Sequence, residues 1–583
     1  MLKKLSACIG EYKLVSIITP VFMILEVIME MIIPRMMASI IDNGVNVGNL
    51  NHVWRIGSLM VAATLLSLCF GLAGARSAAK ASTGFARNLR RSMYERIQTF
   101  GFSNIDKFST AGLVTRLTTD VTNLQNAYQM ILRMCFRAPV SLICALVMAF
   151  SISARLSSVF VVALIFLGGC LGMIMTRTFH LFDKVFRQYD ALNASVQENV
   201  SAIRVVKAYV REAHETQKFQ LESSKLYDLF VRAERRMVLV MPLMQFTIFA
   251  SLLTLSWMGA KLVVAGGLST GNLMSLFTYI MNILMNLMML SMIFVMVVMS
   301  RASAERIAEV LGEESSLKNP AEPLQTVPNG EIVFRHVNFS YQENGNRVLK
   351  DIDFTVRAGE TLGILGGTGS AKSSLVQLIP RLYDVTEGQV LVGGHDVRAY
   401  DLDTLRNAVA MVLQKNVLFS GTIKENLRWG NKQATDEQLI EACELACADE
   451  FIRSFPDGYD TYIEQGGSNV SGGQKQRLCI ARALLKKPRV LILDDSTSAV
   501  DTATDAQIRA AFAQKIPGTT KIIIAQRISS VQDADHILVL DEGAINGFGT
   551  HEQLLQSNAI YREVYDSQMK GGAQPCQDQD KTE

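Results

Sequence analysis

The sequence predicts an all-α membrane domain of six helices followed by a soluble α/β nucleotide-binding domain. Three observations support this fold class: six apolar runs in the first half, a change of composition near residue 312, and a glycine-rich motif in the second half. Hydrophobic residues make up 49% and charged residues 19%, and the mean hydropathy is +0.21. Soluble chains of this length are seldom so apolar. The net charge of +3 argues against a nucleic-acid binder.

The six apolar runs each reach the roughly 20 residues that a helix needs to cross a bilayer. They lie at 15–41, 53–80, 130–153, 156–180, 236–265 and 272–300. Two long links, 81–129 and 181–235, carry many Lys and Arg residues, which mark the cytoplasmic side of a membrane protein. We therefore expect both links and both termini in the cytoplasm. Few Gly or Pro interrupt the links, which predicts membrane helices that extend beyond the bilayer.

The change of composition sets the expected domain boundaries. Residues 1–311 form the membrane domain, 312–330 a linker with three prolines, 331–569 the soluble domain and 570–583 a disordered polar tail. Alternating strand and helix patterns in the soluble part predict an α/β fold. The short loops of the membrane domain favour a bacterial inner (plasma) membrane.

A phosphate-binding loop is predicted where a strand pattern at 361–365 meets a helix. Its residues are Gly366, Gly367, Thr368, Gly369, Ser370, Ala371, Lys372, Ser373 and Ser374. In such a P-loop, backbone N–H groups and a helix N-terminus hold the phosphates of ATP. Lys372 would reach the β and γ oxygens, and the Ser373 hydroxyl would bind Mg²⁺. Ala371 stands where the motif usually has Gly, and its Cβ restricts the backbone.

A second motif follows further along the chain. The apolar run 490–493 ends in Asp494 and Asp495, and Asp494 has the chemistry to hold Mg²⁺ through water, facing the phosphate loop. Between the two motifs lies Ser471-Gly472-Gly473-Gln474, a hydroxyl and small residues where a helix would begin. Such a helix start is a good receptor for a γ-phosphate.

With these residues the chain resembles the ABC transporter family, and specifically its exporter half-transporters. Val470–Arg477 (VSGGQKQR) resembles the family signature, Ser498–Asp501 resembles the D-loop, Tyr341 matches the aromatic residue that stacks on adenine, and Gln414 matches the Q-loop. The resemblance implies that two halves dimerise head to tail. Each ATP then lies between the P-loop of one half and Ser471–Gln474 of the other. It also implies that Gln414 contributes to the Mg²⁺ site.

The resemblance further implies that ATP closes the dimer and that hydrolysis loosens it. Coupling regions in the long links, near 110–121 and 203–212, would transmit this change to the membrane helices.

Three positions depart from the family pattern. Asp495 replaces the Glu that orients the attacking water, Gln526 replaces the switch His, and Ala371 replaces the P-loop Gly. Gln can donate a hydrogen bond but does not become charged near neutral pH. We therefore expect the degenerate half of a heterodimer, whose partner half supplies an intact Glu and His. A working homodimer is the alternative.

The membrane helices give two hints about cargo. Methionines recur with helical spacing in the last run and would trace one face: Met281, Met285, Met288, Met292, Met296 and Met299. Flexible methionines suit varied apolar ligands, whereas the alternative is packing between helices. Glu26 and Glu30 share a face of the first run, where charges are costly. They either attract cationic cargo or pair with Arg35 or with a basic residue on another helix.

These features favour ATP-driven export of amphipathic small molecules, either drug-like compounds or lipids. A flippase for lipids or lipid-linked precursors is the second interpretation, since the same architecture serves both. An importer of siderophores built on the exporter fold and a non-transporting, ATP-gated regulator or channel are further alternatives.

Overall fold

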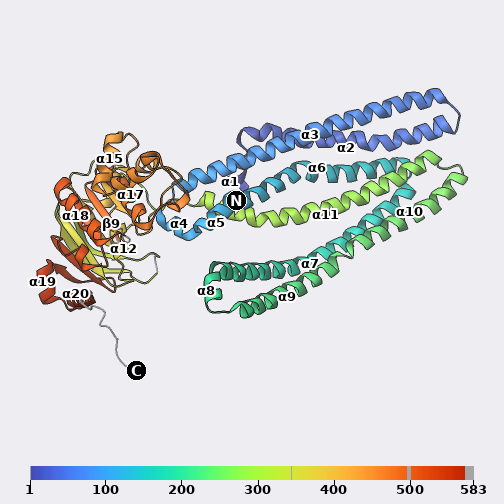
Figure 1. The fold of residues 1–583 in the computed structure, drawn as a ribbon. Coiled ribbons are helices and arrows are strands. Elements are labelled where there is room, and N and C mark those ends of the chain that lie inside the picture. Colours follow the sequence, from blue (N-terminus) through green and yellow to red (C-terminus); the bar gives the residue numbers. More distant parts are fainter. Residues whose placement is uncertain (1, 343–344, 496–499, 572–583) are drawn as a thin grey trace. The chain divides into compact units, whose positions relative to one another are not determined.

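The computed structural model of this 583-residue chain describes residues 2–342, 345–495 and 500–571 (Figure 1). The chain divides into two compact units. Unit 1 comprises Met1–Gln98 and Thr110–Glu313, and unit 2 comprises Thr99–Ser109 and Glu314–Glu583. The short segment 99–109, which the sequence analysis assigned to the membrane domain, therefore groups with the nucleotide-binding unit.

Unit 1 is built from long helices. They are α1 (Leu2–Ala7), α2 (Lys13–Ile40), α3 (Leu50–Gln98), α5 (Thr110–Thr115), α6 (Val121–Ile152), α7 (Ala154–Ser201), α8 (Ile203–Ala208), α9 (Glu212–Met237), α10 (Val240–Val264) and α11 (Thr270–Gly312). Within the described part of the chain, six helical segments are long and apolar enough to cross a membrane. The expected six-helix membrane domain is thus confirmed. The charged links are helical continuations, because α3 runs for 49 residues and α7 for 48.

Hydrogen bonds join α2 to α11 along one end of unit 1. The Tyr279 hydroxyl donates to the Met31 carbonyl at 3.0 Å, and the Ser275 hydroxyl donates to the Pro34 carbonyl at 2.6 Å. Asp42 accepts hydrogen bonds from the Ser269 hydroxyl and from the Gly271 N–H at the start of α11. The polar turns after α2 and before α11 therefore lie at the same end of unit 1.

Unit 2 contains two main sheets. The first has the order β2-β1-β4-β5 and is antiparallel; the second has the order β12-β11-β3-β10-β9-β6 and is parallel except for β12. The strands are β1 (Ile332–Phe339), β2 (Leu349–Val356), β3 (Thr361–Gly366), β4 (Glu387–Val392), β5 (His395–Asp396), β6 (Val409–Val412), β9 (Val490–Asp494), β10 (Thr520–Ile524), β11 (His536–Asp541) and β12 (Ala544–Gly549). A small pair, β7 (Gly421–Thr422) and β8 (Tyr462–Ile463), lies apart from both sheets. This confirms the predicted α/β domain.

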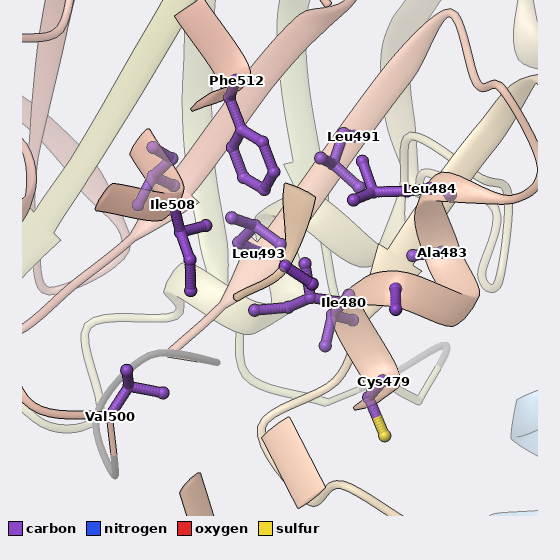
Figure 2. Packing of buried hydrophobic residues seen from close by; sticks show 14 of the residues in the cluster. Cys479, Ile480, Ala483, Leu484, Leu491, Leu493, Val500, Ile508 and Phe512 are labelled. Atoms are coloured by element: carbon purple, nitrogen blue, oxygen red, sulfur yellow. The ribbon is translucent and has the colours of Figure 1, made fainter. Parts of the chain in front are cut away.

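The helices of unit 2 surround these sheets. They are α4 (Phe102–Phe108), α12 (Lys372–Gln377), α13 (Leu402–Ala408), α14 (Ile423–Leu427), α15 (Asp436–Leu445), α16 (Asp449–Ser454), α17 (Gly472–Leu484), α18 (Thr502–Lys515), α19 (His551–Ser557) and α20 (Ala559–Gly571). Figure 2 shows how one face of α17 packs against β9 and α18: Ile480 and Leu484 lie beside Leu491, Leu493 and Phe512. Strands buried on both faces read as continuous apolar runs, as in 490–493.

Helix α4 interrupts the membrane half of the sequence but belongs to unit 2. Asn104 is buried, and its side chain accepts from the N–H groups of Gly101 and Ser316 and donates to the Glu314 carbonyl. The segment 314–317 that follows α11 is thereby fixed to α4. Along the chain, α4 is separated by only a few residues from α3 before it and from α5 after it. The region 110–121, which the family resemblance assigned to coupling, belongs to unit 1.

Candidate nucleotide-binding site

Four parallel strands bring the predicted motifs to one edge of the sheet. The P-loop follows β3, Asp494 ends β9, Gln526 follows β10 and Gln414 follows β6. These strands are neighbours in the order β3-β10-β9-β6. The carboxyl edge of a parallel sheet is where α/β proteins bind ligands.

A cavity of about 310 Å³ lies at this edge. Its lining contains most of the predicted site: Thr368, Gly369, Ser370, Ala371, Lys372, Ser373, Ser374, Gln414, Asp494, Asp495 and Gln526, together with Val348 and Ile524. The structure thus brings together the P-loop, the two acidic residues and the switch residue. From the sequence, these residues were expected to lie together only because each belongs to a nucleotide-binding motif.

The P-loop has the curled backbone that phosphate binding requires. Gly369 has φ of +86°, and a Cβ on Gly366 would lie 2.3 Å from the Leu540 carbonyl oxygen, so both positions need glycine. The Lys372 ammonium donates to the Gly366 and Gly367 carbonyls at 2.9 and 2.7 Å. Burial lowers the pKa of Lys372. Ala371 adopts φ of +72° and ψ of 20°, the left-handed region that costs a Cβ-bearing residue about 1–2 kcal/mol.

Ser373 and Asp494 offer the oxygen ligands that Mg²⁺ prefers. The Ser373 hydroxyl donates to the Asp494 carboxylate at 3.0 Å, so the two groups converge. Asp494 is 3% exposed, and burial raises its pKa. A buried carboxylate beside a hydroxyl fits a hard cation that keeps some of its water. Among the described residues, no group of three or more His, Cys, Asp or Glu side chains gathers as metal ligands.

Asp495 and Gln526, two of the three positions that depart from the family pattern, contact each other. The Gln526 side-chain amide donates to Asp495 at 2.9 Å, and the Gln414 amide lies 3.5 Å from the same oxygen. Asp495 has φ of +48°, which is unusual for a residue with a Cβ. Gln526 therefore donates a hydrogen bond directly to the carboxylate of Asp495.

Tyr341 is connected to both the P-loop and α4. Its ring is 46% exposed, and its hydroxyl is hydrogen-bonded to the Ser374 hydroxyl at 2.8 Å. Its ring meets the Tyr383 ring edge-on, with 5.2 Å between centroids. The Tyr383 hydroxyl donates to Asp106 of α4 at 2.6 Å, and burial, followed by this hydrogen bond, raises the pKa of Tyr383.

Ser471–Gln474 do not line the cavity. They form the N-terminus of α17, where the Ser471 hydroxyl accepts from the Gln474 N–H and the Gln474 side chain accepts from the Ser471 N–H. This capping box fixes an exposed helix start. Of the proposed D-loop, Ser498 and Ala499 lie outside the described residues, and Asp501 caps α18 through the Thr504 N–H. The tail from residue 572 also lies outside them.

The candidate cargo residues of unit 1 have different surroundings. Arg137 of α6 forms ion pairs with Glu26 at 2.5 Å and with Glu30 at 2.8 Å, while Arg35 contacts Ser151. The two carboxylates thus pair with a basic residue on another helix. Four methionines of α11 are substantially exposed on unit 1, namely Met281, Met285, Met292 and Met299, whereas Met288 and Met296 are half-buried. The methionine face is therefore directed mainly away from the other helices of this chain.

Comparison with known proteins gives the class. Residues 16–302 match the family model described as the ABC transporter transmembrane region, and residues 349–498 match the model described as ABC transporter. The chain belongs to the ABC transporter family. It is built as an exporter-type half-transporter and hydrolyses ATP coupled to transport.

Similar proteins span between 73% and 99% of this chain. The uncharacterized ABC transporter ATP-binding protein YfiB of Bacillus subtilis is 34% identical over 99% of this chain and 100% of its own length. YheI of the same organism, described as a probable multidrug resistance ABC transporter ATP-binding/permease protein, is 35% identical over 73% of this chain and 74% of its own. A solved bacterial Atm1-family ABC exporter with ATP bound shares the fold, with a TM-score of 0.81 and 24% identity over 95% of this chain and 99% of that one.

Sequence reasoning missed three residues that support the site. Asp106 and Tyr383 are 277 positions apart, and Gln568 of α20 contacts the backbone around Gln526. No local pattern marks these residues.

Proposed function

We propose that this chain is the degenerate half of a heterodimeric exporter of amphipathic small molecules. Its own ATP site would bind nucleotide and turn over slowly. Its signature, Ser471–Gln474, would complete the faster site of a partner half that has the usual Glu and His. ATP-driven transport follows from the family, whereas the unequal sites and the cargo class are the proposal.

The contact between Asp495 and Gln526 carries this proposal. A water-orienting Glu must reach past the γ-phosphate, and Asp495 is one methylene shorter. Its carboxylate also accepts a hydrogen bond from the Gln526 side-chain amide at 2.9 Å. The two side chains that depart from the family pattern are therefore bonded to each other. Loss of a positioned general base typically costs about 10²–10⁴-fold in rate.

Nucleotide binding should nevertheless persist at this site. Lys372, Ser373, Asp494 and Tyr341 keep the positions that phosphate, Mg²⁺ and adenine would need. If Mg²⁺ binds, Ser373, Asp494 and Gln414 would hold it, and it would neutralise phosphate charge. The strain at Ala371 reduces the stability of the loop but leaves its N–H groups in place.

The exposed methionine face of α11 supports an amphipathic cargo. Methionine side chains adapt to ligands of different shape because they are unbranched and polarisable. A face directed away from the helices of its own chain is available to a cargo, a lipid or the partner half. Lipids would suit this surface as well as drug-like molecules do. We place the protein in the inner membrane of a bacterium, with both termini in the cytoplasm, and its bacterial relatives support that location.

The test compares variants in the assembled transporter, with the full chain and its partner half in phospholipid nanodiscs. Asp495→Glu combined with Gln526→His should change total ATPase activity less than about twofold, because the partner's site already dominates. Ser471→Ala should remove most of the activity.

Ser468→Ala, in the same exposed loop, is the matched control. Melting curves are needed because Ser471 also caps α17, and loss of such a cap costs about 0.5–2 kcal/mol. A large gain on restoring Glu and His, with little loss from Ser471→Ala, would contradict unequal sites.

A further inference from the structure

The last helix of unit 2 reaches the switch residue of the ATP site. The Gln568 side chain of α20 makes two hydrogen bonds to the backbone on either side of Arg527, the residue that follows Gln526. Its Nε2 donates to the Gln526 carbonyl at 2.8 Å, and its Oε1 accepts from the Ile528 N–H at 2.9 Å. We propose that Gln568 is a positioning residue that fixes the switch loop for ATP hydrolysis.

Gln568 supplies the described hydrogen-bond partners of the Gln526 carbonyl and of the Ile528 N–H. Strand β10 ends at Ile524 and the next short helix begins at Ile528, so residues 525–527 connect the two. The connection is anchored at its start, where Ala525 is buried and donates its N–H to the Ile364 carbonyl, and the Arg527 side chain contacts the Thr502 hydroxyl. Within it, the Gln526 side chain extends to Asp495. The position of a side chain in a loop is only as well defined as the position of the backbone that carries it. The two bonds from one planar amide fix both the position and the orientation of that backbone.

Helix α20 is anchored well enough to act as a support. Tyr561, near its start, is fully buried, and its hydroxyl is hydrogen-bonded to His551 of α19 at 2.6 Å. Gln568 lies seven residues further, about two helical turns. Gln568 itself is exposed, so burial does not explain its place. Both ends of its amide are nevertheless engaged by complementary groups.

The clamp depends on the primary amide of Gln568. Its amide combines one acceptor and two donors, so it can bond a carbonyl and an N–H together. Glutamate keeps the acceptor for the Ile528 N–H but has no donor for the Gln526 carbonyl. Alanine removes both bonds. The two variants therefore separate the two halves of the clamp.

The clamp should affect hydrolysis rather than nucleotide binding. Lys372, Ser373 and Tyr341 come from other parts of the unit and do not contact residues 525–528 through any described hydrogen bond. A misplacement of about 1 Å at a catalytic group can cost up to about 10²-fold in rate. We expect Gln568→Ala to slow hydrolysis at this chain's own site about tenfold. The inference rests on the ATPase activity of the family and holds for a homodimer or a heterodimer.

The experiment uses the full chain, with its partner half where one is needed, in phospholipid nanodiscs. Gln568→Ala and Gln568→Glu are compared with Ser567→Ala, an exposed neighbour on the same helix. Hydrogen–deuterium exchange of peptides covering 525–531 reports the clamp directly. Binding of a fluorescent ATP analogue and single-turnover hydrolysis report its effect, both in the natural chain and with Asp495→Glu plus Gln526→His.

The proposal predicts faster exchange at 525–531 for Gln568→Ala, by about tenfold at Ile528. It also predicts unchanged analogue affinity and slower hydrolysis in at least one of the two backgrounds. Gln568→Glu should retain part of the Ile528 protection, and Ser567→Ala should match the parent. Unchanged exchange, unchanged hydrolysis in both backgrounds, or an affinity loss equal to the rate loss would each overturn it.

Discussion

The ion pairs of Arg137 with Glu26 and Glu30 provide a quantitative test of what holds unit 1 together. Breaking a buried pair by removing one partner costs about 3–5 kcal/mol, because a charge is left without compensation. These side chains keep between 16% and 41% of their surface, so the cost here is smaller. We expect Arg137→Gln to destabilise unit 1 by about 2–3 kcal/mol.

The double variant Glu26→Gln, Glu30→Gln should be damaged in a similar way, since it leaves Arg137 alone among apolar helices. The triple variant Glu26→Gln, Glu30→Gln, Arg137→Gln removes all three charges. Replacing a whole buried ion group is often neutral or stabilising. The triple variant should therefore recover most of the loss.

Thermal unfolding in nanodiscs measures these differences. A loss of about 2–3 kcal/mol should lower the melting temperature by about 4–12 °C, at roughly 2–4 °C for each kcal/mol. Transport of a cationic and a neutral dye by the same variants addresses cargo. If the ion pairs have a structural role, the triple variant should regain transport of both dyes. If it regains transport of the neutral dye alone, Glu26 and Glu30 attract cations. Equal stability of Arg137→Gln and the parent would refute the electrostatic reasoning.

Three further predictions concern topology, metal binding and the contact with α4. In a chain without its nine native cysteines, Cys introduced at Asn46 or Ser269 should react with an impermeant thiol reagent outside intact cells; labelling of 81–129 or 181–235 would reverse the assignment. Mg²⁺-dependent nucleotide binding should weaken on acidification at a higher pH than for an ordinary Asp, because burial raises the pKa of Asp494 and its protonated form does not hold the ion. Asp494→Asn should flatten this titration curve. Tyr383→Phe and Asp106→Ala should each weaken nucleotide affinity about two- to tenfold, non-additively, because one hydrogen bond orients the ring beside Tyr341. Tyr400→Phe, whose hydroxyl donates to the Val392 carbonyl, is the control, and additive losses would argue against a shared contact.

Much of the fold and the core of the site could be predicted because their signals are local. An apolar run of bilayer length defines a span, and the spacing of Gly366, Lys372 and Ser373 defines a phosphate loop by its own backbone requirements. The strand that ends in Asp494 is likewise recognised from its own apolar run and the acidic residue that follows it. Each of these depends only on residues close together in the chain.

Long-range pairings could not be predicted in the same way. Sequence placed Glu26 and Glu30 on one face but could not identify Arg137 as their partner, because that depends on how α6 is rotated. The methionine spacing predicted that these residues share one face of α11, but not whether that face packs against the other helices of the chain or is exposed. The positions of Asp106 and Gln568 depend on how distant segments dock, which no periodicity records.

The ATPase activity of the purified chain, alone and with candidate partner halves, tests the central claim most directly. Unequal sites predict that this chain alone hydrolyses ATP at least about 10²-fold more slowly than the assembly with a partner that supplies Glu and His. They also predict that the chain alone still binds ATP. Robust ATP turnover and transport by a homodimer of this chain would contradict the claim.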